Sequence, residues 1–575
     1  MIQLCDMVTA RDFKNQMLDS MDIERERGIT IKSQTICLPY KAKDGQTYTL
    51  NLVDTPGHVD FSYEVSRALT SCEGAILLID AAQGVEAQTL ANLYLAMEND
   101  LEIVPVINKI DLPAAEPEAV ALQIEDDLGL DIDRIVMCSA KTGKGVDEVL
   151  EAIVKFLPPP VGDSTKPLQA LIFDASYDPF RGTIISCRIM QGEIKPGEII
   201  TFMATGANYK VEEVGLFHLK RFPQKKLSAG QVGYIIAGVK TVSDTSPGDT
   251  ITHKDRPSPT PLPGFKEIQQ VVFSSLYPIT TDEYENLAVA MEKLKLNDAA
   301  LTFQKDSSSA LGFGFRCGFL GLLHLEVIQE RLEREFDIPL ILTVPSVNYH
   351  FFLNDDTMLE VDNPAYFPDP SSIKRTEEPY IKATILIPER YMGPVMTLCM
   401  ERRGEKTSYH YPIQGRIEFS CELPLAEVIY DFYDKLKSIT QGYGSFDYAL
   451  IDYRPSDLVK LDILVNGERV DALSQLTHRS RARERGLHAC ERLKEEIPRQ
   501  MFKIAIQAAI GGTVVARTTI SALRKDVTAK CYGGDITRKR KLLEKQKEGK
   551  KRMKTVGNVD IPQSAFLAVL KSDQK

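Results

Sequence analysis

The sequence predicts a multidomain protein of mixed α/β and α+β class: an α/β domain, a β-barrel, two α+β domains and a mixed, basic C-terminal domain. Three observations predict this organisation. A chain of 575 residues is too long for a single hydrophobic core. Its apolar pattern changes from buried strands alternating with helices to short strands separated by glycine. Clusters of proline mark two of the boundaries.

The first domain, residues 1–160, alternates apolar runs with helical patterns. The runs include 50–53, 75–79, 103–107 and 134–137. Nearly continuous apolar strands joined by helices are typical of a parallel sheet that is covered on both faces. Such a sheet binds its ligands beyond the carboxyl ends of the strands, and the polar motifs of this domain stand there.

The pattern of apolar and turn-forming residues changes after the Pro158 to Pro160 linker. Residues 161–255 contain short alternating strands with glycine turns between them, which favours a small β-barrel. Four prolines between positions 257 and 263 mark the next boundary.

Residues 264–352 and 375–455 share one plan. In each, a strand-like run (268–273 and 380–387) precedes a helix, and further strands and a second helix follow. Both patterns are typical of a split βαβ sandwich, the ferredoxin-like arrangement. The remaining residues, 456–575, have no single periodicity and form the mixed C-terminal domain.

The composition excludes several classes of protein. Hydrophobic residues make up 43% of the chain and charged residues 26%, as in ordinary globular proteins. Ten cysteines are scattered without a C-x-x-C pair, which argues against a zinc ribbon or disulfide framework and for small buried thiols in a reducing compartment. No apolar run is long enough to span a membrane. The first twenty residues show no signal-peptide pattern.

The charge is distributed unevenly. The chain carries a net charge of −11, yet residues 524–554 contain 13 Lys/Arg and four Asp/Glu. A basic segment in an acidic chain favours contact with a polyanion over the alternative of a solvated helix face. Tyr532 is its only aromatic residue, so we expect it to bind RNA phosphates rather than stack on bases. The candidate RNA-binding residues are Arg538, Lys539, Arg540, Lys541, Lys550, Lys551 and Arg552.

One motif predicts a site for the terminal phosphate of a nucleoside triphosphate. Asp54 ends an apolar run, where its carboxylate can hold Mg²⁺ through water. Gly57 leaves room for the backbone to approach the phosphate, and His58 projects from the next turn towards the attacking water. An ordinary Asp-Thr-Pro-Gly turn is the structural alternative.

A second pair of motifs predicts recognition of guanine. Asn108, Lys109 and Asp111 follow the apolar run 103–107, and the Asp111 carboxylate can accept two hydrogen bonds from the N1–H and N2 amine of guanine. Adenine lacks that pair of donors. The loop with Ser139, Ala140 and Lys141 follows at the expected distance, so a mere turn at the strand end is disfavoured.

The glycine-rich loop that cradles phosphates in such proteins, G-x-x-x-x-G-K-[ST], does not occur in the sequence, whose first glycine is Gly28. The α/β domain is therefore expected to be a phosphate-loop GTPase domain that lacks its first strand and phosphate loop. Two explanations stay open. Either the sequence begins at an internal methionine or is a fragment, or the domain is degenerate and works without nucleotide.

The motifs resemble those of a known family. Residues 25–30 (RERGIT) together with 54–61 (DTPGHVDF) resemble translational GTPases in general. Residues 307–324, 466–473 and 530–535 resemble the elongation factor 4 (LepA) family in particular, and this resemblance covers essentially the whole chain. The basic C-terminal domain disfavours elongation factor G.

The resemblance implies a set of functions and ligands. It implies a GTPase that uses GTP/GDP and Mg²⁺, with Thr30 as a Mg²⁺ ligand beside Asp54 and His58 as the catalytic residue. The implied partners are the ribosome, through rRNA and ribosomal proteins, and tRNA. The implied role is back-translocation of tRNA and translational fidelity under stress, by a monomer in the cytoplasm.

Peripheral association with the inner face of the cell membrane and an organellar source both stay open. A nucleotide-independent ribosome-binding or assembly factor is the alternative function.

His324, in a Leu-rich stretch without a second ligand nearby, is expected to be a packed or capping histidine.

Overall fold

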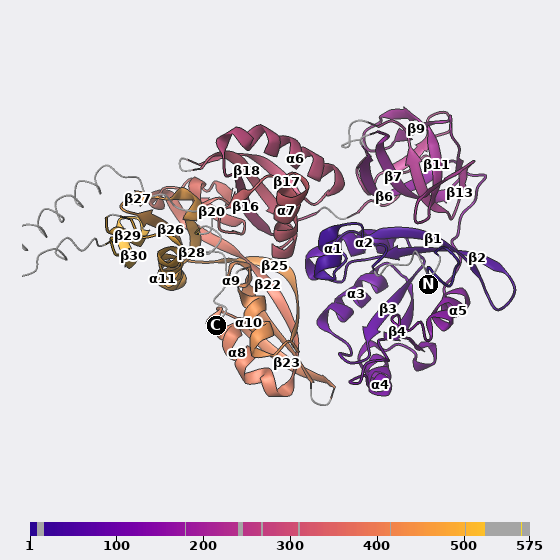
Figure 1. Cartoon of the computed structure of the whole chain (residues 1–575), viewed down its shortest axis with the longest axis horizontal. Coiled ribbons are helices and arrows are strands. Elements are labelled where there is room, and N and C mark those ends of the chain that lie inside the picture. Colours follow the sequence, from indigo (N-terminus) through magenta and orange to yellow (C-terminus); the bar gives the residue numbers. More distant parts are fainter. Residues whose placement is uncertain are drawn as a thin grey trace, which may run out of the picture.

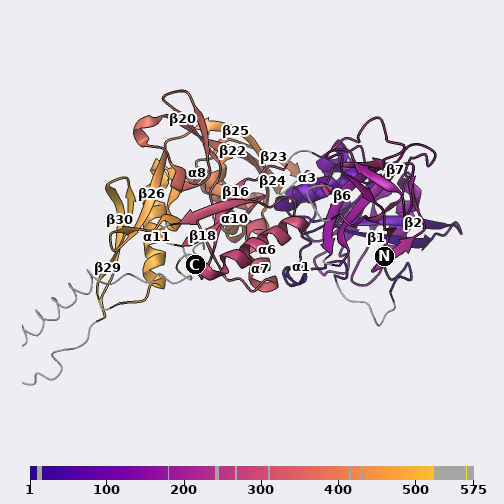
Figure 2. The same ribbon diagram turned by 90° about the horizontal axis from the view of Figure 1, so that it is seen from above.

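The computed structural model describes residues 1–8, 16–178, 180–239, 245–265, 268–308, 311–413, 416–429, 431–500, 502–523 and 565. The basic segment 524–554, with every candidate RNA-binding residue, lies outside the described residues. The N-terminal α/β region and the β-barrel lie together at one end of the molecule, and the last strands lie at the other (Figures 1 and 2). The part of the chain that the structure describes contains no helix long and apolar enough to cross a membrane.

The N-terminal α/β region contains a parallel sheet in the order β3-β4-β5 and a separate antiparallel hairpin of β1 and β2. Helix α4 shows why these elements form where they do: it starts at a proline and ends before Gly129, which takes the left-handed conformation. The elements of the region are α1 (Asp22–Arg27), β1 (Gln34–Lys41), β2 (Thr47–Asp54), η1 (Val59–Phe61), α2 (Ser62–Thr70), β3 (Gly74–Asp80), α3 (Ala87–Glu98), β4 (Glu102–Asn108), α4 (Pro117–Leu128), η2 (Ile132–Arg134), β5 (Val136–Met137) and α5 (Val146–Phe156).

The sequence prediction was wrong on one strand of this region. The apolar run 50–53 lies in β2, which pairs antiparallel with β1 and not with the parallel strands. Between β2 and β3 the structure shows no pairing among the described residues. Leu78, in the middle of β3, is 58% exposed. The run 134–137 is also shorter than expected, because η2 occupies its first residue.

The β-barrel region confirms the prediction of a small all-β unit. Its strands follow the order β10-β9-β15-β6-β7-β14-β11-β12, and β8 pairs with β13. Ile, Leu, Val and Phe side chains from these strands fill its interior. The strands are β6 (Gln169–Asp178), β7 (Gly182–Gln191), β8 (Glu193–Ile194), β9 (Ile199–Phe202), β10 (Asn208–Lys210), β11 (Glu213–Phe217), β12 (Arg221–Gln224), β13 (Leu227–Ser228), β14 (Val232–Ile236) and β15 (Thr250–His253).

The first α+β region has the predicted ferredoxin-like connectivity. Two β-α-β units interlock so that the strand order is β17-β18-β16-β19, with antiparallel pairing. Its elements are β16 (Val272–Pro278), η4 (Thr281–Glu283), α6 (Tyr284–Asn297), β17 (Thr302–Ser308), β18 (Gly312–Phe319), α7 (Leu322–Glu335) and β19 (Leu340–Leu342).

The second α+β region repeats this plan and extends it. Its sheet has the order β21-β20-β22-β24-β23, and β25 pairs with the other edge of β22. The elements are β20 (Tyr349–Leu353), β21 (Met358–Val361), η5 (Pro364–Tyr366), η6 (Pro370–Ser372), β22 (Ile373–Pro388), η7 (Glu389–Tyr391), α8 (Met392–Glu401), β23 (Glu405–Ile413), β24 (Arg416–Pro424), α9 (Leu425–Val428), α10 (Phe432–Ile439) and β25 (Ser445–Pro455).

The C-terminal region forms a sheet in the order β27-β26-β29-β30 with β28 paired to β26, and α11 packs on it. Its core includes Tyr277, Ile341 and Val344 of the first α+β region, so the two pack as one body. Its elements are β26 (Leu458–Val465), β27 (Glu468–Arg469), η8 (Asp471–Leu473), β28 (Gln475–His478), α11 (Arg479–Glu496), β29 (Ile504–Ile510) and β30 (Thr513–Ile520).

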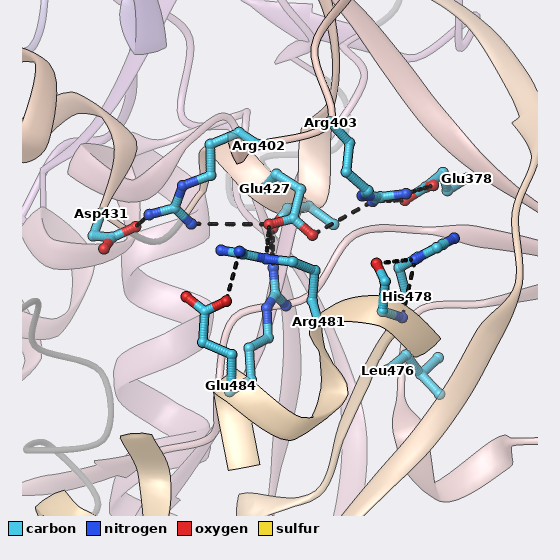
Figure 3. A network of polar contacts seen from close by, with 12 residues as sticks. Glu378, Arg402, Arg403, Glu427, Asp431, Leu476, His478, Arg481 and Glu484 are labelled. Carbon is cyan, nitrogen blue, oxygen red and sulfur yellow. Dashed lines mark hydrogen bonds and ion pairs between the residues drawn. The ribbon is translucent and has the colours of Figure 1, made fainter. Parts of the chain in front are cut away.

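A buried carboxylate joins this region to the second α+β region. Glu427 of α9 is 1% exposed, and guanidiniums approach it from the end of α8 and from α11 (Figure 3). Arg485 Nη2 lies 3.2 Å and Arg481 Nε 3.5 Å from Glu427 Oε2, while Arg403 Nη2 lies 3.4 Å from Oε1. Burial alone would raise the pKa of Glu427, but the surrounding arginines outweigh it and hold the pKa below its usual value.

Candidate functional site

The predicted guanine-binding residues lie at the carboxyl ends of neighbouring parallel strands. Asp80 ends β3 and Asn108 ends β4, and the two residues are register partners. Met137 ends β5 beside them, so the loops after β4 and β5 meet. The Asn108 side-chain oxygen accepts a hydrogen bond from the Ala140 amide at 2.9 Å. This bond ties the two loops together.

Ser139 holds Asp111 in place. The Ser139 side chain is fully buried, and its hydroxyl donates to Asp111 Oδ1 at 2.7 Å. This hydrogen bond keeps the pKa of Asp111 below its usual value, with a smaller contribution from the charge of Lys141. The Asp111 carboxylate is therefore ionised at neutral pH and acts only as an acceptor, as the pairing with two guanine donors requires.

Lys109 adopts a strained backbone. Its φ of +64° lies in the left-handed region, which a residue with a side chain rarely occupies. Its Nζ forms an ion pair with Asp80 Oδ2 at 2.7 Å, across the ends of β4 and β3. The ion pair and the loop bonds hold this conformation, and strain of this kind is commonly found at binding sites.

Acidic side chains gather where the Mg²⁺ ligands were predicted. Asp54 is the last residue of β2. Burial raises its pKa to about 6, and the neighbouring carboxyls of Asp19 and Glu24 add to the effect. Thr30 Oγ1 donates to Asp19 Oδ1 at 3.1 Å. Crowded carboxyl and hydroxyl oxygens are the donor set that Mg²⁺ prefers, so the residues fit this ion.

Asp19 is a residue that the motifs did not predict. It precedes the recognised segment and has no pattern of its own, but the structure buries it beside Thr30. Among the described residues no group of three His, Cys, Asp or Glu side chains could hold a metal ion by itself.

Gly57 and His58 lie in the turn between β2 and η1. A Cβ built on Gly57 meets no protein atom within 4 Å, so space inside the protein does not explain this glycine. His58 Nδ1 accepts a hydrogen bond from the Asp60 amide at 3.2 Å. The ring also lines a cleft of about 1040 Å³, together with residues of α7 and of the second α+β region.

The structure therefore links the guanine-binding candidates Asn108, Asp111, Ser139 and Ala140 by direct hydrogen bonds. It gathers Asp19, Thr30 and Asp54 into a second group, while Gly57 and His58 follow Asp54 on the adjoining turn.

His324 is buried and accepts the Leu320 amide on Nδ1, as expected for a capping histidine. The nine cysteines that the structure describes are free thiols, and all but Cys72 are buried.

Comparisons with known families match most of the chain. The profile described as "Elongation factor Tu GTP binding domain" matches residues 1–159, and "Elongation factor Tu domain 2" matches 182–252. The profile described as "Elongation factor G C-terminus" matches residues 375–464, and "GTP-binding protein LepA C-terminus" matches 465–571.

Curated relatives align over the whole chain. A protein from Desulfotalea psychrophila named Elongation factor 4 is 78% identical over 574 residues, which is 100% of this chain and 96% of the relative. Proteins of the same name from Syntrophus aciditrophicus and Borreliella burgdorferi are 69% and 58% identical. They also align with 100% of this chain, and with 96% and 94% of their own lengths.

A crystal structure of a protein from Thermus thermophilus shares the fold. It aligns with a TM-score of 0.55 at 16% identity and covers 79% of this chain and 94% of that chain. At this identity the match concerns the arrangement of elements alone.

Proposed function

Because the chain belongs to the elongation factor 4 (LepA) family of translational GTPases, we propose that it binds the ribosome and couples GTP hydrolysis to back-translocation of tRNA. The proposal includes support of translational fidelity and efficiency under stress, in the cytoplasm. The single observation that carries the nucleotide part is the preformed group of Asn108, Asp111, Ser139 and Ala140 at the strand ends.

Each residue of the site has a chemical task in this proposal. Asp111, fixed by Ser139, accepts hydrogen bonds from the N1–H and N2 amine of guanine. Thr30 and Asp54 would hold Mg²⁺, which supplies positive charge against the phosphate oxygens. The open space at Gly57 admits the phosphate chain, and His58 orients the attacking water through its Nε2 side, because Nδ1 already accepts the Asp60 amide.

A second candidate function, kept as the alternative, needs no nucleotide. The 575 residues contain no G-x-x-x-x-G-K-[ST] loop, which in GTPases supplies phosphate-cradling amides and a Mg²⁺-ligating hydroxyl. A nucleotide-independent ribosome-binding or assembly factor would not need that loop. The two functions differ in whether the intact guanine-binding residues are used.

The guanine assignment is tested by Asp111→Asn, because an amide at this position can donate to the 2-oxo group of xanthine. Weak binding to the chain can be followed by NMR titration with GDP and XDP at millimolar concentration. We expect the unsubstituted chain to prefer GDP and the variant to prefer XDP by about tenfold or more. Asp126→Asn, an exposed change on α4, is the matched control. An unchanged preference in the Asp111 variant would contradict the assignment.

The ribosome part of the proposal is tested by co-sedimentation with bacterial ribosomes. We expect the chain to sediment with ribosomes in a salt-dependent manner, because phosphate contacts release counterions. If the chain binds ribosomes but shows no guanine preference, the nucleotide-independent function is favoured. A chain that does not sediment with ribosomes would contradict both functions.

A further inference from the structure

The catalytic turn of the GTPase region contacts a helix of the first α+β region. Asp60, two residues after His58, is buried, and its Oδ2 accepts a hydrogen bond from the Leu323 amide at 2.8 Å. Leu323 lies in the first turn of α7, where backbone amides have no partner within the helix. Asp60 thus caps a helix that lies 263 residues away in the sequence.

Gly321 leaves space for the Asp60 carboxylate. Its backbone is extended, with φ near −175°, so its conformation does not require glycine. A Cβ on Gly321 would nevertheless lie closer than 3.0 Å to the Cγ and both carboxyl oxygens of Asp60. The absence of a side chain at Gly321 is explained by the approach of Asp60.

The same aspartate is tied to His58. The Asp60 amide donates to His58 Nδ1 at 3.2 Å, so a neutral His58 carries its proton on Nε2. The next residue, Phe61, is buried in a cluster with Ile23, Ile31 and Val327 of α7. The turn that follows His58 is therefore fixed to α7 at Asp60 by a hydrogen bond and at Phe61 by apolar packing.

Helix α1, which precedes Thr30, docks on the same face of α7. Arg27 pairs with Glu326 and Glu330, each at 2.9 Å, and Arg334 pairs with Glu26 at 2.7 Å. Exposed pairs of this kind contribute little energy, but three of them fix the register of two helices. Helix α7 therefore contacts both segments that flank the predicted phosphate site.

We propose that Asp60 is a positioning residue through which α7 sets the orientation of His58. Displacement of α7 from Asp60 releases the η1 turn and the histidine ring. The orientation of the first α+β region relative to this turn therefore controls hydrolysis. The use of His58 in hydrolysis rests on the proposed function, whereas the contact between Asp60 and α7 is tested without any nucleotide.

The first test measures hydrogen exchange of the Leu323 amide in the full chain. Asp60→Ala removes the acceptor, and we expect exchange at Leu323 to rise about tenfold to a hundredfold. Asp60→Asn keeps an acceptor oxygen and should restore most of the protection. Gly321→Ala should raise exchange as Asp60→Ala does. Gly393→Ala, at a helical glycine whose added Cβ meets nothing within 4 Å, is the control that should not.

The second test reports on the His58 ring. In ¹⁵N NMR spectra of the full chain we expect the His58 signals of the Nε2–H tautomer. Asp60→Ala should give signals of a mixture of the Nε2–H and Nδ1–H tautomers. Asp60→Asn should keep the signals of the Nε2–H tautomer. If Leu323 exchange rises while the His58 signals stay unchanged, Asp60 only joins two regions and the proposal is overturned. Unchanged exchange in both Asp60→Ala and Gly321→Ala would overturn it as well. Neither result depends on whether the chain hydrolyses GTP.

Discussion

At the residue scale, the site depends on side chains whose charge is set by their neighbours. Asp111 is held ionised by Ser139, whereas Asp54 has its charge opposed by burial and by Asp19 and Glu24. The motifs predicted Asp54 because it stands directly after an apolar run, and Asp111 because it belongs to the Asn108, Lys109 and Asp111 motif that follows another. They could not predict Asp19, Asp60 or Gly321, because the roles of these residues depend on contacts between segments far apart in the sequence.

The raised pKa of Asp54 gives a prediction on pH and metal. The folded chain keeps a proton on Asp54 up to about pH 6, whereas an unfolded aspartate loses it near pH 4. The unfolding free energy should therefore fall as the pH rises from about 4 to 6, and the penalty should be fully present above pH 6. At pH 7.5, Asp54→Asn should raise the melting temperature in EDTA, and Mg²⁺ should stabilise the unsubstituted chain only.

This is measured by thermal unfolding with and without Mg²⁺, with Asp126→Asn as the exposed control. An equal gain from Mg²⁺ in the Asp54 variant would show that the ion is held elsewhere.

At the element scale, periodicity was a good guide to helices and a poorer one to strand partners. The patterns 64–71 and 88–97 became α2 and α3, and the two α+β regions have the predicted ferredoxin-like order. The run 268–273 was placed too early, since β16 begins at Val272, and the run 380–387 is only half of β22. The first half of β22 was missed because residues 373–379 are mostly charged or polar and show no apolar alternation, although they pair with β20 and β25.

The buried Glu427 predicts how the C-terminal region is held. Glu427→Gln leaves the guanidiniums of Arg402, Arg403, Arg481 and Arg485 without their shared carboxylate. Loss of one partner from a buried ionic group costs about 3–5 kcal/mol, so amide exchange in α11 should become markedly faster. Glu484→Gln is the matched control, because Glu484 also pairs with Arg481 but is 64% exposed. Equal effects of the two changes would show that Glu427 has no special role.

At the scale of the whole molecule, the sequence predicted a chain of successive regions, and the profile matches and the structure confirm that class. It could not predict how the regions pack. The two α+β regions share one apolar core, and the C-terminal region adds to it through Tyr277 and Ile341. Such contacts leave no periodic signal, because the residues involved are simply apolar positions on separate elements.

The basic segment gives a prediction for the intact protein on the ribosome. Replacing Arg538, Lys539, Arg540 and Lys541 with Gln should weaken ribosome binding most at low salt. The slope of log affinity against log salt should fall by roughly 0.7 for each phosphate that the variant no longer neutralises. Replacing four exposed lysines of the barrel region, Lys210, Lys220, Lys225 and Lys254, changes the net charge equally and serves as the control. An unchanged slope in the first variant would identify 538–541 as a solvated surface.

Ribosome-stimulated GTP hydrolysis is the decisive assay for the proposed function, and it uses a form of the chain extended at its N-terminus with a β-strand and a G-x-x-x-x-G-K-[ST] loop. We predict that bacterial ribosomes accelerate GTP hydrolysis by the extended form and that the 575-residue chain shows no turnover. In the extended form, His58→Ala should lower kcat about a hundredfold and leave the affinity for GTP nearly unchanged. Ribosome-stimulated hydrolysis that is unaffected by His58→Ala, or an extended form that binds GTP but is not stimulated by ribosomes, would contradict the account.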